Sequence, residues 1–233
     1  MKNSFFCHLL HVFYDLVASR FRDPVVYYFG IGGGKAVSAE GYQPIDILSP
    51  LIASDFSLLI GSDISKGNFR AFVSLVKREL GQLPGIEMGD VSFSELTKDA
   101  EFQVDFMFMG KSRTIRIYYN VDSTKEGPSA LNKSLRKGFQ VLFSRGIPGI
   151  IPDMVRGKTM EKLLGNLSDG GLLFLEMPEN FTLPGPGLRQ EEHTVVSDFS
   201  IFKRIRLYSL EQPSRMWPLL ILGKIFSTFR RAA

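Results

Sequence analysis

The feature that most constrains the fold is a short apolar run that stops at a cluster of glycines. Residues 25–29 are β-branched and aromatic, as in a buried strand, and they are followed by Gly30, Gly32, Gly33 and Gly34. A glycine loses more backbone entropy on folding than any other residue, so it is favoured where φ is positive or where another group approaches the main chain. The cluster predicts a sharp turn after a buried strand, or a turn against which a ligand lies.

Further apolar runs alternate with helical patterns along the chain. Strand-like runs occupy 58–60, 139–143 and 172–176, and apolar residues recur at helical spacing over 68–80. This alternation predicts an α/β fold with a doubly wound, mostly parallel, seven-stranded-type sheet and helices on both faces (Rossmann-like). Residues 168–171 have the composition of a turn.

Two stretches depart from that pattern. Residues 101–109 and 113–119 alternate apolar and polar side chains around Gly110, as in a hairpin with one face more exposed to solvent. They predict an extra hairpin at the edge of the sheet. Residues 194–196 and 199–208 are also rich in strand-forming residues.

Composition and charge limit the classes of partner. The chain has 233 residues, 44% of them hydrophobic, and its net charge of +4 is a mild excess rather than a nucleic-acid footprint. Cys7 is the single cysteine, and no Cys/His spacing fits a zinc site. These observations predict a cytoplasmic protein with no metal and no nucleic-acid partner.

The two ends of the chain differ in composition from the rest. Residues 4–20 have the spacing of an amphipathic helix, and the end of the chain interleaves basic with apolar residues. We therefore expect an N-terminal helical segment at 1–24, a main domain at 25–212 and a C-terminal apolar-basic segment at 213–233. The last is either a peripheral membrane or protein contact or a helix packed on the domain with a solvated basic face.

The glycine cluster was compared with three patterns of nucleotide binding. A phosphate-binding loop requires Ser or Thr after its lysine, but Lys35 is followed by Ala36. A dinucleotide fingerprint requires glycine at the position of Lys35. The remaining pattern, formed by Gly30, Gly32 and Gly34, suits a nucleoside that approaches bare main chain, and a plain tight turn stays open as the alternative.

The order of the segments resembles that of the class I S-adenosylmethionine-dependent methyltransferases. The resemblance covers 25–208 and rests on VVYYFGIGGG at 25–34, LLIGSDIS at 58–65, FQVLFSRG at 139–146 and EKLLGNLSDGGLLFLE at 161–176. It implies that the glycine turn contacts S-adenosylmethionine, with Gly33 in the same loop, and that Asp63 accepts hydrogen bonds from the ribose. The adjacent Ile64 is also expected to contact the cofactor. Capping of the helix that follows would also explain an acid at position 63.

The resemblance also implies an acidic residue on the adenine side and contacts after the fourth strand. Asp122 and Asp90 are the candidates for the acid, and we prefer Asp122 because Asp90 would put a whole hairpin between the third and fourth strands. Ser144 and Arg145 follow the fourth strand. Tyr28 departs from the family, which usually has an acid at this position.

The predicted activity is S-adenosylmethionine-dependent methyl transfer to a small-molecule acceptor. The loop after Ser144 lacks the Asn/Asp-Pro-Pro-Tyr motif common in amino-group methylases of nucleic acids and proteins. No catalytic residue is assigned. Two alternatives remain. Tyr28 favours a catalytically silent methyltransferase-like binding domain, and the architecture also suits a nucleotide-dependent oxidoreductase, against which Lys35 counts.

Overall fold

The fold is described from a computed structural model that covers most of the chain. The described residues are 13, 15–31, 56–81, 85–94, 101–144, 149–178, 180–185, 187–196 and 203–210. The C-terminal segment at 213–233, most of the glycine loop and Arg145 lie outside them. Within the described part, no helix is both long and apolar enough to cross a membrane.

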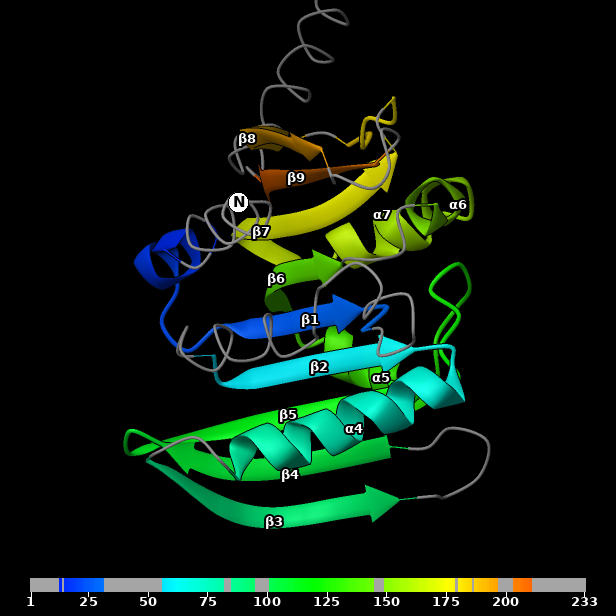
Figure 1. Ribbon diagram of the computed structural model, residues 1–233. Coiled ribbons are helices and arrows are strands. Elements are labelled where there is room, and N and C mark those ends of the chain that lie inside the picture. The colour runs from blue at the N-terminus through cyan, green and yellow to red at the C-terminus, as the bar shows by residue number, and fades with distance from the viewer. Residues whose placement is uncertain are drawn as a thin grey trace, which may run out of the picture.

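A nine-stranded sheet forms the centre of the described structure, in the order β3-β4-β5-β2-β1-β6-β7-β9-β8 (Figure 1). Neighbours from β5 to β7 are parallel, whereas β9 is antiparallel to both β7 and β8. The strands are β1 (Val25–Phe29), β2 (Leu58–Asp63), β3 (Ile86–Ser94), β4 (Glu101–Phe108), β5 (Lys111–Tyr119), β6 (Phe139–Ser144), β7 (Leu167–Pro178), β8 (Leu188–Val196) and β9 (Lys203–Leu210).

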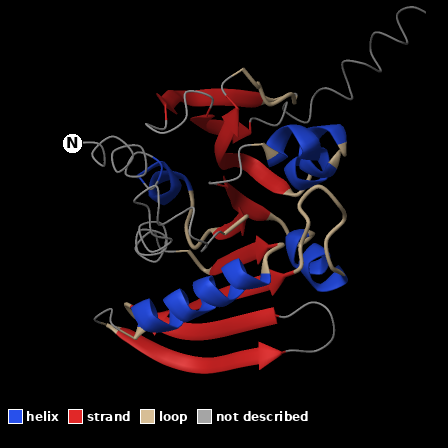
Figure 2. Ribbon diagram, turned by 45° about the vertical axis from the view of Figure 1, so that its right-hand side comes forward, coloured by secondary structure: helices blue, strands red, loops and turns tan. Residues whose placement is uncertain are grey.

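Helices cover both faces of the sheet (Figure 2). They are α4 (Lys66–Leu80), α5 (Ser129–Leu135), α6 (Ile150–Arg156) and α7 (Thr159–Leu164). Successive side chains of a strand point to opposite faces, so Tyr28 packs in the core beneath α4, and Tyr27 packs in the core beneath α5, α6 and α7. The predicted doubly wound class is confirmed.

Residues 13 and 15–20 pack against the same face of the sheet as α4. Phe13 and Val17 are buried, and the Phe13 ring lies 5.0 Å from the ring of Phe174 in β7 and 5.8 Å from that of Phe143 in β6, measured between centroids. Residues 15–20 are helical. This segment therefore contributes side chains to the core of the sheet.

The predicted hairpin is confirmed, because β4 and β5 pair antiparallel from Glu101–Tyr118 to Phe108–Lys111. The segment at 113–119 forms β5, which pairs in parallel with β2 and belongs to the main sheet. A further strand, β3, pairs antiparallel with β4 on its outer side, and the sequence pattern did not indicate it. Asp90 lies in β3, the outermost strand, so β4 and β5 separate it from β2.

The segment at 168–171 is not a turn between elements but an irregular stretch within β7. The pairing with β6 shifts from Phe139–Leu167 to Val141–Leu172, and Gly170 has φ +71°. A Cβ on Gly171 would lie 2.5 Å from Cγ of Leu167. Glycine is therefore required here because neighbouring atoms of the same strand leave no room for a side chain at this position.

Candidate functional site

Four strand ends meet at one edge of the sheet. Gly30 follows β1, Asp63 ends β2, Asp122 follows β5 and Ser144 ends β6, and these strands are parallel neighbours. The carboxyl ends of β1, β2 and β6 point the same way in Figure 1. Ligands of open α/β sheets bind outside this edge, so the fold brings four of the predicted residues to the expected place.

The first turn begins at Gly30, which has φ +65°, a backbone conformation that favours glycine. The amides of Gly30 and Ile31 both donate to the carbonyl oxygen of Ser62, at 2.8 and 3.2 Å. This pair of bonds fixes the turn to the end of β2. Gly32, Gly33 and Gly34 lie outside the described residues, and their predicted contacts with a cofactor stay predictions.

The carboxylate of Asp63 holds the first turn of α4. Its Oδ1 accepts from the amide of Ser65 at 2.7 Å, and Nδ2 of Asn68 lies 3.3 Å from both carboxylate oxygens. The hydroxyl of Ser65, directly before the helix, accepts from the amide of Asn68 at 3.3 Å, as an N-cap does. Asp63 is only 5% exposed, whereas the neighbouring Ile64 is 58% exposed.

Asp122 is engaged in a turn of its own. Its Oδ1 accepts from the amide and the hydroxyl of Thr124, at 3.0 and 2.6 Å, and Nζ of Lys125 lies 3.0 Å from Oδ2. The hydroxyl hydrogen bond from Thr124, with the Lys125 charge beside it, holds the pKa of the Asp122 carboxyl below its usual value. The amide of Val121 donates to the carbonyl of Asp63 at 3.1 Å, which ties this turn to the end of β2.

Ser144 differs from the two acids because its side chain is not engaged. The residue is 1% exposed, and its Oγ has no hydrogen-bond partner among the described residues. It pairs with Phe29 in β1 and Leu175 in β7, which places it beside the Gly30 turn. Unsatisfied buried hydroxyls are uncommon in native proteins and call for an explanation.

Tyr28 is a core residue. It is 3% exposed, its ring meets those of Phe143 and Phe72 edge-on at 4.9 and 6.4 Å between centroids, and its hydroxyl donates to the carbonyl oxygen of Ile31 at 3.3 Å. The buried Tyr28 side chain therefore stabilises the turn through a hydrogen bond from the core. It brings no negative charge to this position.

Residues that the sequence reasoning did not single out support the site. Ser65 and Asn68 bind Asp63, and Thr124 binds Asp122. On the other face, the hydroxyls of Tyr27 and Ser62 lie 2.9 Å apart. Only the Asp-x-Ser-x-x-Asn spacing from Asp63 to Asn68 was visible in the sequence, as a helix-start signal. The two clefts that border α7 contain none of the four strand-end residues.

The order of the strands defines the class of fold. Five parallel strands run β5-β2-β1-β6-β7, and the antiparallel β9 is inserted between β7 and β8. This is a Rossmann-like sheet of the class I methyltransferase type, with the β3–β4 pair added at one edge.

Comparisons with known proteins concern the same fold. No protein-family model matches the sequence, and no curated protein sequence matches it. Similar solved structures include a proposed methyltransferase, yhhF, from Escherichia coli, with 10% identity over 88% of this chain and 86% of that one and a TM-score of 0.49. Others are an rRNA methylase from Streptococcus thermophilus, with 12% identity over 87% and 96% and a TM-score of 0.45, and the mitomycin 7-O-methyltransferase MmcR, with 11% over 84% and 52% and a TM-score of 0.41. Likeness at these identities describes the fold alone.

One expectation is corrected. We predicted a small-molecule substrate and no nucleic-acid partner, but the similar structures include an rRNA methylase from Streptococcus thermophilus and a proposed one from Clostridium thermocellum. The small-molecule acceptor was predicted from the missing Asn/Asp-Pro-Pro-Tyr motif after Ser144. The exclusion of nucleic acid rested on the mild net charge, and a net charge is a sum that does not tell how cations are distributed over a surface. Nucleic acid is therefore no longer excluded as a partner.

Proposed function

We propose that the protein is an S-adenosylmethionine-dependent methyltransferase whose cofactor lies at the carboxyl edge of β1, β2, β5 and β6. The observation that carries the proposal is the buried, unpartnered hydroxyl of Ser144 at this edge, where no described residue satisfies it. A hydroxyl can donate one hydrogen bond and accept two, and a polar ligand at the edge would satisfy it. The strand order and the sequence resemblance of the four stretches support this choice of ligand.

The bound cofactor would supply an electrophilic methyl group on sulfur, so the protein's task is mainly orientation and exclusion of water. In our proposal, Gly30 turns the chain so that its main chain can lie against the nucleoside. Ser144 hydrogen-bonds the cofactor near β6. Asp63 accepts from the ribose hydroxyls, and Asp122 lies on the adenine side.

Asp63 and Asp122 already accept hydrogen bonds from the protein, so the proposal requires that each can also bind the ligand. A carboxylate offers about four acceptor positions, so holding α4 and holding a diol are compatible tasks for Asp63. With 5% exposure, little of the residue is open to a ligand. Asp122 is more accessible, with 27% of its side chain exposed.

Thermal unfolding with ligands tests the proposal directly. A specific ligand at a hundred times its Kd adds about 2.7 kcal/mol of apparent stability, which for a chain of this size raises the melting temperature by roughly 5 to 10 °C. We expect this rise with S-adenosylhomocysteine and S-adenosylmethionine. A rise with NAD, and none with either sulfur nucleoside, would instead support the oxidoreductase alternative.

Asp63→Asn is the variant that examines the ribose contact. An amide accepts through one oxygen only, so the variant should lower the affinity for S-adenosylhomocysteine. Asp105→Asn is the matched control, because Asp105 lies in β4 and binds Gln103 and Thr114. Equal affinity of both variants and the parent protein would reject Asp63 as the ribose ligand.

A second candidate function follows from Tyr28. A buried aromatic ring stands where the family usually has an acid that helps to fix the methionine end of the cofactor, which favours a domain that binds the nucleoside without methyl transfer. Incubation with methyl-tritiated S-adenosylmethionine and either total RNA or a small-metabolite extract separates the two functions. Label transfer to either pool supports the enzyme, whereas stabilisation by the nucleosides with no transfer to either pool supports the silent domain.

A further inference from the structure

A cleft of about 360 Å³ lies between α5 and α7, on the opposite face of the sheet from α4. It runs from the loop at 123–127, just after Asp122, to Arg136 and Asn166 near the amino ends of β6 and β7. Its volume falls within the range typical of small-molecule sites. It contains none of the four strand-end residues, so it is a separate feature of the surface.

Positive charge predominates in this cleft. Lys125, Arg136 and Lys162 line it, against the single acid Glu126. Lys125 is paired with Asp122, but among the described residues Arg136 and Lys162 have no ion-pair or hydrogen-bond partner for their side chains, which are exposed. Two unpaired cations on facing helices form a site that attracts an anion.

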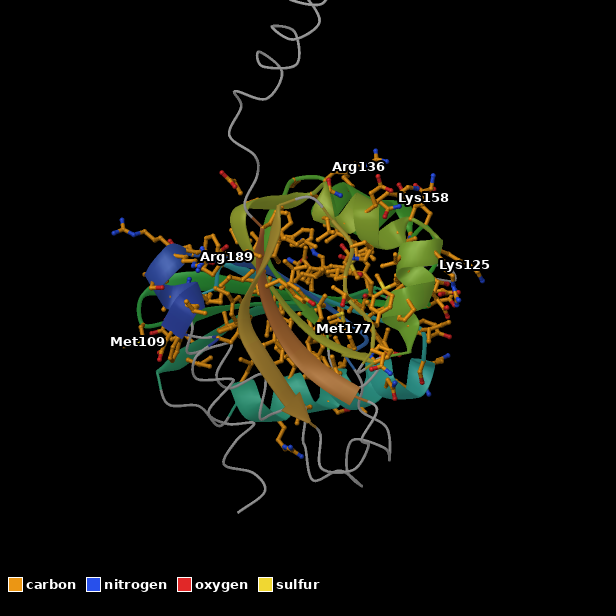
Figure 3. All side chains as sticks on the ribbon, turned by 90° about the horizontal axis from the view of Figure 1, so that it is seen from above. Met109, Lys125, Arg136, Lys158, Met177 and Arg189 are labelled. Atoms are coloured by element: carbon orange, nitrogen blue, oxygen red, sulfur yellow. The ribbon has the colours of Figure 1, made fainter. Side chains whose placement is uncertain are left out.

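The surroundings extend the same charge. Three further exposed lysines adjoin lining residues in the sequence, namely Lys133 on α5, Lys137 after Arg136 and Lys158 before α7. Figure 3 shows Arg136, Lys158 and Lys125 along one side of the molecule. A ligand with several negative charges would therefore meet cations beyond the cleft itself.

The floor of the cleft is apolar and its walls are fixed. Leu131, Leu135 and Leu163 line it and are buried. The side-chain amide of Asn132 donates to the carbonyl of Gly127 at 2.7 Å, and this bond holds the loop against α5. An apolar floor under a cationic rim suits a ligand that has a flat ring as well as a charged group.

We propose that the α5–α7 cleft binds a nucleotide unit, with its phosphate at Arg136 and Lys162 and its ring on the leucine floor. The guanidinium of Arg136 can bind a phosphate through two parallel hydrogen bonds, and Lys162 adds a point charge. The phosphate-bearing unit comes from one of two sources, an RNA strand or a free nucleotide. The cleft contains none of the residues named for the cofactor site, and the ion pair between Lys125 and Asp122 is the contact between the two.

The test compares two charge-matched double variants by fluorescence anisotropy. Arg136→Gln/Lys162→Gln removes the two unpaired cations of the cleft. The control, Arg22→Gln/Arg70→Gln, removes the same charge from exposed positions before β1 and on α4. The probes are a fluorescein-labelled twelve-nucleotide single-stranded RNA and a fluorescent ATP analogue, and thermal melts establish that all forms are folded.

The cleft variant should bind about tenfold more weakly, as expected for losing hydrogen bonds to a charged group, and the control should change affinity less than about twofold. For RNA, the slope of log affinity against log salt should become shallower by about 0.7, because the variant no longer neutralises the one phosphate held by Arg136 and Lys162. Weaker binding of the RNA probe alone identifies a nucleic-acid strand, and weaker binding of the ATP analogue identifies a free nucleotide. Equal weakening in both double variants, or no binding of either probe to the parent protein, would overturn the proposal.

Discussion

Replacing Ser144 by alanine should stabilise the ligand-free protein and weaken its binding of S-adenosylhomocysteine. The two effects have opposite signs because they come from one hydroxyl. In the free protein this buried group has no partner among the described residues, and in the proposed complex it hydrogen-bonds the ligand. A purely structural serine would not separate the two measurements in this way.

The magnitude follows from burial. Ser144 is 1% exposed, and leaving a buried polar group unsatisfied costs about 1 to 3 kcal/mol. Alanine removes that cost, but it also leaves a small void and weakens the local van der Waals attraction. We expect a net gain of about 1 kcal/mol in the free energy of unfolding, or roughly 2 to 4 °C in melting temperature. Losing one hydrogen bond to the ligand should weaken binding by about 0.5 to 1.5 kcal/mol.

Ser209 supplies a matched control. It is also 1% exposed and its Oγ also lacks a partner among the described residues, but it lies in β9 opposite Leu172, away from the strand ends of the candidate site. Ser209→Ala should therefore give the same gain in stability with unchanged ligand affinity. Both variants change the same atom in the same kind of environment.

Urea unfolding measures the stability of each variant, and isothermal titration calorimetry measures S-adenosylhomocysteine binding. If Ser144→Ala lowers stability while Ser209→Ala raises it, the Ser144 hydroxyl is already satisfied in solution and the reasoning fails at its first step. If stability rises but the affinity of Ser144→Ala equals that of Ser209→Ala, the ligand does not contact this hydroxyl. In either case Ser144 is lost as support for the proposed site.

Two further predictions concern the framework of the site. Burial raises the pKa of Tyr27 to about 12 even though its hydroxyl bonds Ser62, so the stability that this group contributes is complete below pH 10 and is lost by up to roughly 2 to 3 kcal/mol between pH 10 and 12. Urea unfolding of Tyr27→Phe should show a weaker decline over that window, and an identical decline would contradict the assignment. Gly171→Ala should cost about 1 to 3 kcal/mol because its Cβ would meet backbone at 2.7 Å. Gly149→Ala should be neutral or slightly stabilising because its Cβ has open space. Thermal melts measure both glycine variants, and equal effects of the two would refute the packing argument.

The parallel core of the sheet was predictable because its strands are buried on both sides. The runs at 25–29, 58–60 and 139–143 are almost wholly apolar, and they form β1, β2 and β6. Such runs have few alternatives to a central strand. The helix at 68–80 was visible for a similar reason, since its apolar residues keep one face against the sheet.

The outer strand β3 could not be read from the sequence because its pairing is not local. Its residues, IEMGDVSFS, lack a sustained alternation, and its register with β4 shifts between Met88 and Val91. The stretch at 168–171 misled the prediction for a related reason. Its Ser-Asp-Gly-Gly composition suits a turn, but the neighbouring β6 holds the chain in the sheet on both sides of it.

At the candidate site, the sequence predicted where the two acids lie but not which groups they bind. Asp63 and Asp122 come to neighbouring strand ends as predicted, but each carboxylate is also hydrogen-bonded by residues two to five positions further along. Local bonds of this kind are the usual reason for an acid at a strand–helix junction. A single sequence cannot tell such an acid from one that holds a ligand, because both uses select the same residue at the same place.

These two uses of Asp63 are physically linked, and the linkage bears on how the site works. The carboxylate that would hold the ribose also holds the amide of Ser65 and the side chain of Asn68 in the first turn of α4. Those bonds fix the orientation of the carboxylate before any ligand arrives, so little side-chain entropy remains to be lost on binding. In the proposed complex, helix capping at this position would preorganise the ribose site, and it is also an alternative explanation for the acid.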